Sequence, residues 1–133
     1  MITISVCMIV KDEEMVLERA LKSVERIADE IIIVDTGSTD RTKKIALKYT
    51  DKVYDFVWCD DFAKARNYSF SKATMDYCMW LDADDIISDS DQEGLINLKK
   101  TLSKDTSVVM MKYNAEFDQN NKPTFTYYRE RLL

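Results

Sequence analysis

Three short apolar runs, each closing on acidic residues, constrain the fold of this 133-residue chain more than any other feature. They cover Ile4–Val10, Glu30–Asp35 and residues 77–81. Their hydrophobic character is nearly continuous rather than alternating, which indicates strands buried on both faces, as in a parallel sheet. Segments with a helical spacing of apolar residues separate the runs. The sequence therefore predicts an α/β fold.

The other predicted elements extend this alternation along the whole chain. Further strands are expected at residues 53–58, 108–113 and 124–129, with a polar turn at residues 118–123. Helices are expected to begin at the acidic stretch 12–14, to follow the turn 37–40, and to cover residues 61–73 and 92–102. Strands that alternate with helices form parallel sheets with right-handed crossovers, and the last two strands would make the sheet mixed. We expect one domain over residues 1–133, a three-layer sandwich around a mostly parallel, mixed central sheet.

The balance of charged residues excludes several classes of function. The formal net charge is -5, whereas binding to a nucleic acid backbone needs clustered Lys and Arg, so no nucleic acid partner is expected. The sequence contains no histidine, which excludes Ser-His-Asp triads and imidazole metal ligands. The three cysteines have long spacings, which indicate neither a disulfide framework nor a zinc site.

The sequence indicates a protein of the cytoplasm. No run approaches the roughly 20 apolar residues that span a bilayer, so no transmembrane segment is predicted. The N-terminus enters its first apolar run without a preceding basic segment, and no small-residue cleavage site follows, which argues against a signal peptide. The cysteine usage fits a reducing compartment.

Acidic residues follow three of the predicted parallel strands. Asp12 and Glu13 come after the first strand, Asp35 ends the second, and Asp82 and Asp84 follow the fourth. In open α/β sheets, ligands bind at the carboxyl ends of the parallel strands. Like charges grouped there repel each other unless a cation or hydrogen-bond donors compensate them. The sequence therefore predicts a ligand site at this edge of the sheet.

The pair Asp82 and Asp84 is the sharpest feature of this edge. In extended backbone, residues two apart point to the same face, so both carboxylates could approach one hard cation. Mg²⁺ or Mn²⁺ bound in this way keeps several waters and takes phosphate oxygens as further ligands. The alternative is that residues 82–85 only cap the following segment on its solvent side. The buried run before Asp82 favours the binding edge over a random surface position.

Four motifs lie within residues 4–85 in a fixed order. They read ISVCMIVKDEE at residues 4–14, IVDTGSTD at 33–40, ARN at 65–67 and WLDADD at 80–85. In order and spacing the set resembles the family 2 glycosyltransferases. The resemblance implies a GT-A type, Rossmann-like fold and transfer of a sugar from a nucleotide diphosphate sugar, with a UDP-sugar as the expected donor. The motifs are similar to those of bacterial members in which helical repeats follow the transferase domain.

The resemblance also implies individual roles. Nucleotide binding falls to residues at the strand ends and on the third helix, namely Val10, Glu13, Asp35, Arg66, Asp82 and Ala83. Val10 and Glu13 would line the nucleobase and ribose pocket, and Asp35 would accept a hydrogen bond from the base, typically uracil N3–H. Arg66 would reach the base or the diphosphate. Asp84 would bind Mn²⁺ or Mg²⁺ directly, and Asp82 would contact the ribose or support the metal.

The sequence departs from the family pattern at one place, and some residues have simpler explanations. Many members have Pro-Thr-Tyr-Asn after the first strand, where residues 9–12 read IVKD, which puts base contacts by Tyr or Thr side chains there in doubt. Asp35 could serve only as a turn former before Gly37. Arg66 could be a surface helix residue, and the carboxylates of Glu13 and Glu14 could serve only the helix dipole, which we prefer for Glu14.

The resemblance implies a metal-dependent, inverting transferase. In the family, the carboxylate base that deprotonates the acceptor lies well downstream of the Asp-x-Asp motif, so no catalytic residue is assigned within this chain. We expect the chain to be the N-terminal, nucleotide-sugar-binding part of a longer protein, truncated before the acceptor segment. The acceptor, whether glycan, lipid or peptide, is not indicated. Apolar surface left uncovered near the terminal hairpin would favour self-association.

Two other functions fit part of the sequence. A phosphoryl-transfer enzyme of the haloacid dehalogenase class also carries Asp-x-Asp after an apolar strand. That class, however, uses its first strand and has Thr or Val where Ile86 stands. A non-catalytic nucleotide-sugar-binding module would suit the short chain. A Rossmann dehydrogenase is excluded, because no glycine-rich turn follows the first strand.

Overall fold

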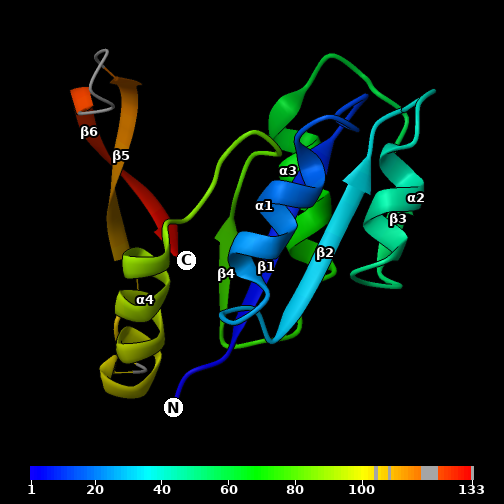
Figure 1. Ribbon diagram of the computed structural model, residues 1–133. Coiled ribbons are helices and arrows are strands. Elements are labelled where there is room, and N and C mark those ends of the chain that lie inside the picture. Colours follow the sequence, from blue (N-terminus) through cyan, green and yellow to red (C-terminus); the bar gives the residue numbers. More distant parts are fainter. Residues whose placement is uncertain (104, 108, 118–122, 133) are drawn as a thin grey trace.

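The computed structural model describes residues 1–103, 105–107, 109–117 and 123–132 (Figure 1). Strands and helices alternate up to the last two strands, as the sequence predicts. In chain order the elements are β1 (Ile4–Val10), α1 (Leu17–Val24), β2 (Glu30–Asp35), α2 (Thr42–Leu47), β3 (Val53–Asp55), α3 (Phe62–Ser71), β4 (Tyr77–Trp80), α4 (Asp89–Thr101), β5 (Val109–Phe117) and β6 (Pro123–Leu132).

The strands form one six-stranded sheet in the order β3-β2-β1-β4-β6-β5. β1 pairs in parallel with β2 on one side and with β4 on the other, and β2 pairs in parallel with β3. The β5–β6 hairpin is antiparallel, and β6 joins β4 through the register pair Met79 and Leu132. This confirms the predicted mixed sheet with a parallel body.

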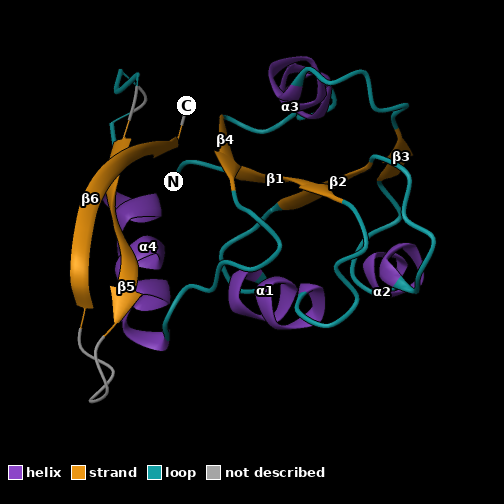
Figure 2. Ribbon diagram, turned by 90° about the horizontal axis from the view of Figure 1, so that it is seen from above, coloured by secondary structure: helices purple, strands orange, loops and turns teal. Residues whose placement is uncertain are grey.

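The parallel strands form the middle of three layers, as predicted. Figure 2 shows α3 on one face of the sheet and α1 with α2 on the other, while α4 lies beside the hairpin. Alternate residues of β1 (Ile4, Val6, Met8 and Val10) are at most 2% exposed and belong to the main core. They pack with buried residues of α1 such as Leu17 and Leu21. Burial of these side chains is the main source of stability at roughly 25 cal/mol per Å² of apolar surface.

The third strand is shorter than predicted. We expected residues 53–58, but β3 ends at Asp55. Its neighbour β2 ends at Asp35, and the amide of Phe56 makes the last bond to the carbonyl oxygen of Asp35, at 2.8 Å. Beyond that point no neighbouring strand offers partners, so Val57 and Trp58 leave the sheet and are exposed. Their apolar character was therefore a misleading strand signal.

The helix boundaries also differ from the prediction. α1 begins at Leu17, beyond the acidic stretch 12–14, because the backbone amides of those residues bond to the β2–α2 connection instead. α4 begins at Asp89, three residues earlier than expected, since the Ser88 hydroxyl accepts from the amide of Asp91 and caps the helix. Both hairpin strands are longer than predicted. Part of the predicted polar turn, residues 118–122, lies outside the described residues.

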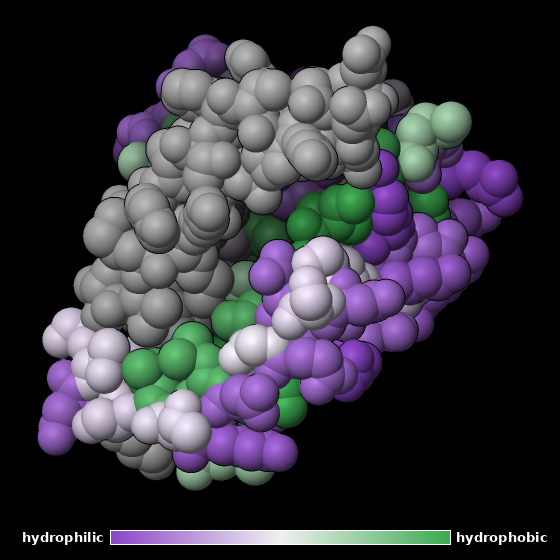
Figure 3. Space-filling model, turned by 60° about the vertical axis from the view of Figure 1, so that its left-hand side comes forward, coloured by the Kyte–Doolittle hydropathy of each residue, from purple (hydrophilic) through white to green (hydrophobic). Residues whose placement is uncertain are grey.

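Two predictions concern the surface of the molecule: the chain has no transmembrane segment, and it self-associates. Within the described part of the chain, no helix combines the length and the apolar character needed to cross a membrane. Apolar side chains emerge between polar stretches on the face shown in Figure 3, and Met15 and Ile86 are exposed by 89% and 55%. Self-association stays a prediction.

A buried carboxylate ties the amino-terminal edge of the sheet together. Glu30, at the start of β2, has a side chain that is 1% exposed and forms an ion pair with Lys52. It also accepts from the hydroxyl of Ser5 at 2.6 Å and from the amide of Thr74 at 2.8 Å. Burial alone would raise the pKa of Glu30, but these donors outweigh burial and lower its pKa from 4.5 to about 2.

This pKa makes acid stability a test of the network. Because the pKa is lowered on folding, ionised Glu30 stabilises the fold above pH 4.5, and this contribution is lost as the pH falls from 4.5 towards 2. Urea unfolding of Glu30→Gln should therefore depend less on pH over that window than unfolding of the parent, by on the order of 2–3 kcal/mol. Glu93→Gln, which alters an exposed ion pair with Arg26, should keep the parent slope.

Candidate functional site

The connections that follow the parallel strands meet at one edge of the sheet. In Figure 1 the arrowheads of β2 and β4 point the same way, so their carboxyl ends share this edge with those of β1 and β3. The register pairs Val10 with Asp35, and Asp35 with Asp55, so the ends of these three strands lie level. All residues predicted to bind the nucleotide or the metal are at this edge or on α3 next to it.

Asp12 fastens the β1–α1 connection to the β2–α2 connection. Its backbone has a positive φ of 51°, and its amide donates to the hydroxyl of Ser38 at 2.9 Å. Its carboxylate Oδ1 accepts from the amide of Thr39 at 2.7 Å. Left-handed backbone is unfavourable for most residues but is tolerated by Asp and Asn. Asp12 therefore holds two site loops together through its conformation and its side chain.

Glu13 and Glu14 continue this contact between the two connections. The amide of Glu13 donates to the hydroxyl of Thr42 at 2.8 Å, and the amide of Glu14 donates to the carboxylate of Asp40 at 3.3 Å. The carboxylate of Glu14 accepts from the amide of Arg41 at 3.1 Å. The preferred interpretation of Glu14, a charge that serves only the dipole of α1, is therefore wrong. Its carboxylate bonds to the loop before α2.

Asp35 combines a structural and an open hydrogen-bonding position. Its side chain is 3% exposed, and Oδ1 accepts from the amides of Gly37 and Ser38, both at 2.8 Å. Gly37 has a φ of 120°, a conformation that side-chain-bearing residues rarely adopt. Among the described residues, no donor reaches Oδ2 of Asp35. Since a buried acceptor without a partner is costly, this oxygen is suited to a donor from a ligand.

Three carboxylates gather after β4. One oxygen from each of Asp82, Asp84 and Asp85 lies within 4.8 Å of the others. The turn closes through the amide of Asp85, which donates to the carbonyl of Asp82 at 3.0 Å, while the amide of Asp82 donates to the Asp85 carboxylate at 3.2 Å. Arg19 on α1 donates to the carbonyl oxygen of Asp84 at 3.3 Å. The predicted pair is thus a group of three, and sequence reasoning missed Asp85.

The negative charges of this group influence the carboxylate of Glu13. Its pKa is raised from 4.5, first by burial and then by the negative charges of Asp84, Asp40, Asp82 and Asp12. Other carboxylates raise the pKa of a carboxylate in this way only when they lie close to it. The connections after β1, β2 and β4 therefore converge, as the sequence predicted.

Arg66 lies between two aromatic rings at the same edge. Its guanidinium is 4.9 Å from the ring centroid of Phe62 and 4.1 Å from that of Trp80, the last residue of β4. Such contacts between a cation and aromatic rings fix the side chain at the edge, which an isolated surface arginine would not show. The aromatic support was not foreseen from the sequence.

Two predicted nucleotide contacts lie deeper than the others. Val10 and Ala83 are 2% and 3% exposed, and both side chains belong to the hydrophobic core. The carbonyl oxygen of Val10 already accepts from the amide of Thr36 at 3.0 Å. These two residues belong to the core on which the edge is built. Their contact with a nucleotide stays a prediction.

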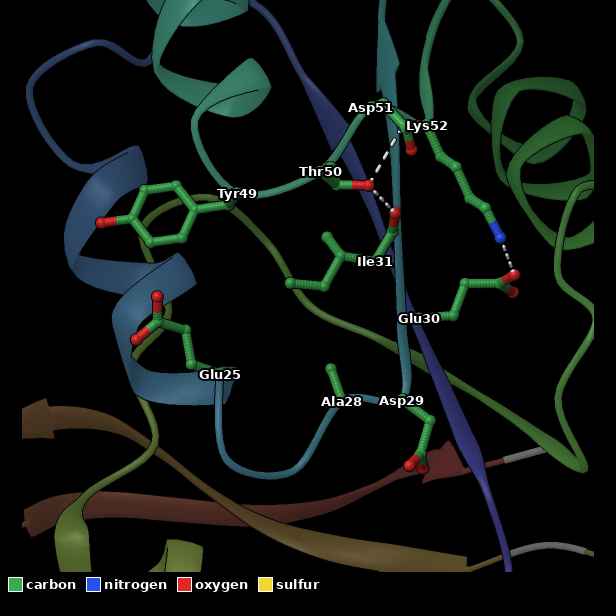
Figure 4. Close-up of a pocket in the computed structure, with 9 residues that line it drawn as sticks. All are labelled: Glu25, Ala28, Asp29, Glu30, Ile31, Tyr49, Thr50, Asp51 and Lys52. Carbon is green, nitrogen blue, oxygen red and sulfur yellow. Dashed lines mark hydrogen bonds and ion pairs between the residues drawn. The ribbon is translucent and has the colours of Figure 1, made fainter.

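A pocket of about 470 Å³ lies at the opposite edge of the sheet, near the amino-terminal ends of β2 and β3 (Figure 4). Its lining includes the ion pair of Lys52 with Glu30 and the hydroxyl of Thr50, which donates to the carbonyl of Ile31 at 2.9 Å. None of the residues predicted to bind nucleotide or metal lines it. The pocket is therefore separate from the candidate site.

The sequence pattern of glycosyl transferase family 2 matches the chain over residues 5–132. The chain belongs to this family. The chain is 47% identical over 85 residues to a TPR repeat-containing protein of Synechococcus elongatus, a match that covers 64% of this chain and 21% of that protein. It is 36% identical over 92 residues to an uncharacterized glycosyltransferase of Rickettsia typhi, covering 69% of this chain and 31% of that protein. The chain thus spans about a fifth to a third of the length of these relatives.

Solved structures confirm the GT-A fold of the chain. It resembles TarS of S. aureus (residues 1–349) with a TM-score of 0.61 and 26% identity, covering 71% of this chain and 30% of that chain. It resembles glucosyl-3-phosphoglycerate synthase of M. tuberculosis in complex with Mg²⁺ and uridine-diphosphate with a TM-score of 0.56 and 26% identity, covering 64% of this chain and 34% of that chain. Family and fold together leave no support for the phosphoryl-transfer alternative.

The loop contact made by Asp12 can be tested by two substitutions. Asp12→Ala removes the acceptor of the Thr39 amide and places Ala at a positive φ, so the free energy of unfolding should fall by roughly 1–3 kcal/mol. Asp12→Asn keeps an acceptor oxygen and tolerates the backbone, and should stay close to the parent. Urea titration of the three proteins measures the difference. Equal stabilities of the Ala and Asn variants would contradict the role given to Asp12.

Proposed function

We propose that this chain forms the donor-binding part of a glycosyltransferase that transfers a sugar from a UDP-sugar to an acceptor hydroxyl with the help of a divalent cation. One observation carries the proposal. A buried carboxylate oxygen that has no partner among the described residues and a group of three carboxylates lie at the same edge of the sheet. The first suits an N–H donor and the second suits a hard cation, and a nucleoside diphosphate with its metal presents both.

The chemistry of Asp35 favours some bases over others. An ionised carboxylate oxygen accepts hydrogen bonds only, so Oδ2 needs an N–H group on the base. Uracil presents N3–H at the centre of its pairing edge, whereas cytosine and adenine present an acceptor nitrogen at the equivalent place. Two acceptors facing each other in a buried site repel. The proposal therefore assigns recognition of uracil to Asp35.

The carboxylates after β4 fit Mg²⁺ or Mn²⁺. Oxygen ligands of Mg²⁺ lie at about 2.0–2.1 Å from the ion, so two ligands on opposite sides are about 4 Å apart. The oxygens of Asp82, Asp84 and Asp85 lie within 4.8 Å of one another, so small side-chain adjustments bring them into that range. Asp84 and Asp82 would hold the cation, with Asp85 beside them. When bound, the cation would neutralise charge on the diphosphate leaving group.

The similar structures support the same ligands. Glucosyl-3-phosphoglycerate synthase of M. tuberculosis has been solved with Mn²⁺ and uridine-diphosphate-glucose, and with Mg²⁺ and uridine-diphosphate. In our proposal Arg66, held between two rings, approaches the base or the diphosphate, while Glu13, Val10 and Ala83 shape the nucleotide pocket. Transfer proceeds with inversion, after a carboxylate base has taken the proton of the acceptor hydroxyl. That base is supplied by protein outside residues 1–133, and the site lies in the cytoplasm.

The metal assignment is tested by Asp84→Ala. Asp84 is exposed, so its removal should leave the fold intact. The parent chain should bind UDP more tightly with Mn²⁺ than without it, and the variant should lose this gain while binding uridine as before. Asp89→Ala, an exposed acid just beyond the group, serves as the control and should behave like the parent. Isothermal titration measures these affinities. Binding of UDP with Mn²⁺ by Asp84→Ala at parent affinity would rule out the assignment.

Base recognition is tested by Asp35→Asn. The variant keeps an oxygen to accept from the amides of Gly37 and Ser38, and it places an NH₂ group at the position of Oδ2. It should lose on the order of 1–3 kcal/mol of UDP affinity, because a buried donor then faces N3–H. Its preference for UDP over CDP should be flattened or reversed. Competition titrations with the two nucleotides decide the matter, and unchanged selectivity would remove Asp35 from base recognition.

A further inference from the structure

Among the four connections that follow the parallel strands, only one carries aromatic residues. The segments that follow β1, β2 and β4 (residues 11–16, 36–41 and 81–88) contain no aromatic residue, whereas the segment after β3 contains Phe56 and Trp58 and leads directly into Phe62. A base bound only through its edge would leave both flat faces without a partner. Aromatic side chains are common partners for such faces, because every base has a π surface.

The backbone brings this connection next to Asp35. The amide of Phe56 donates to the carbonyl oxygen of Asp35 at 2.8 Å. Trp58 follows two residues later, so its Cα lies within roughly 7 Å of that of Phe56. An indole ring on this part of the chain is therefore in reach of a ligand that donates to Oδ2 of Asp35.

The aromatic rings at this edge differ in their exposure. The ring of Phe56 packs on Tyr68 with centroids 5.2 Å apart, and Trp80 is 7% exposed with Arg66 over its ring. Trp58 and Phe62, in contrast, are exposed by 40% and 49%. Their centroids are 6.1 Å apart at an interplanar angle of 72°, so Phe62 supports Trp58 edge-to-face.

The indole of Trp58 is also held in place by a local hydrogen bond. Its Nε1–H donates to the carboxylate of Asp60 at 3.0 Å, and Asp60 has a positive φ of 57°. The next residue, Asp61, caps α3 by accepting from the amide of Lys64 at 3.2 Å. An exposed tryptophan fixed in this way loses little side-chain entropy when a ligand packs on it.

We propose that Trp58, supported by Phe62, packs against the flat face of the nucleobase whose N–H group donates to Asp35 Oδ2. The inference rests on the proposed function and adds a residue for base affinity that the four motifs do not contain. The base would then be bound on two sides, by Asp35 at its edge and by the indole on its face. Affinity for the base, but not for the diphosphate, should depend on an aromatic ring at position 58.

The test compares three variants of the chain with three ligands: UDP, uridine, and pyrophosphate with Mg²⁺. Trp58→Ala should weaken UDP and uridine roughly tenfold and leave pyrophosphate binding unchanged. Trp58→Phe should retain most of the affinity, because it keeps a ring. Val57→Ala, at a position that is 90% exposed in the same segment, is the control and should match the parent. UDP should also quench the tryptophan fluorescence of the parent more than that of Trp58→Phe, in which only Trp80 remains.

The outcomes separate this inference from the proposed function. If the parent does not bind UDP, the proposed function fails and the inference with it. If the parent binds UDP and Trp58→Ala binds it equally well, the inference alone is overturned. A variant that loses pyrophosphate as well as uridine would show that Trp58 only maintains the loop. A variant that binds all three ligands normally but transfers sugar poorly in the longer protein would place Trp58 at the acceptor, which also overturns the inference.

Discussion

The parallel hydrogen bonding of β1 to both β2 and β4 is the constraint on which the rest of the structure depends. Because parallel strands share one direction, every connection after them emerges at the same edge, and the acids of these connections are brought together. The buried face of β1 keeps the three strands in register through side chains with almost no exposure. A slip by one residue would exchange the two buried faces of β1 and put Ser5 and Cys7 in the places of these apolar side chains, so the packing of the core also fixes the geometry of the site.

Crowding of carboxylates at this edge is partly offset by backbone amides. Asp12, Glu14 and Asp35 each accept from amides of the β2–α2 connection, so three negative charges are used to order a loop. The pKa of Glu13 is raised, first by burial and then by negative charges that include those of Asp84 and Asp82 after β4. The carboxylates after β4 are therefore the part of the site that is suited to a cation.

Much of the fold and part of the site could be predicted from the sequence, because they depend on local patterns. Continuous apolar runs located β1 and β2, and the spacing of Asp82 and Asp84 located the acidic group. The failures involve residues distant in sequence. Nothing in the stretch 12–14 reveals that it bonds to residues 38–42, and the end of β3 is set by where β2 ends. The place of Asp85 in the acidic group depends on a tight turn that the motif alone does not specify.

The two oxygens of Asp35 serve different purposes, and this affects which substitutions selection would favour at position 35. Oδ1 contributes to folding through two amides, while Oδ2 is desolvated in the folded protein without compensation among the described residues. That desolvation lowers the stability of the ligand-free protein, and a ligand that donated to Oδ2 would relieve it. The side chain of Asp35 thus affects both the stability of the fold and the affinity for a ligand. Selection for a more stable ligand-free protein at this position would oppose selection for tighter binding.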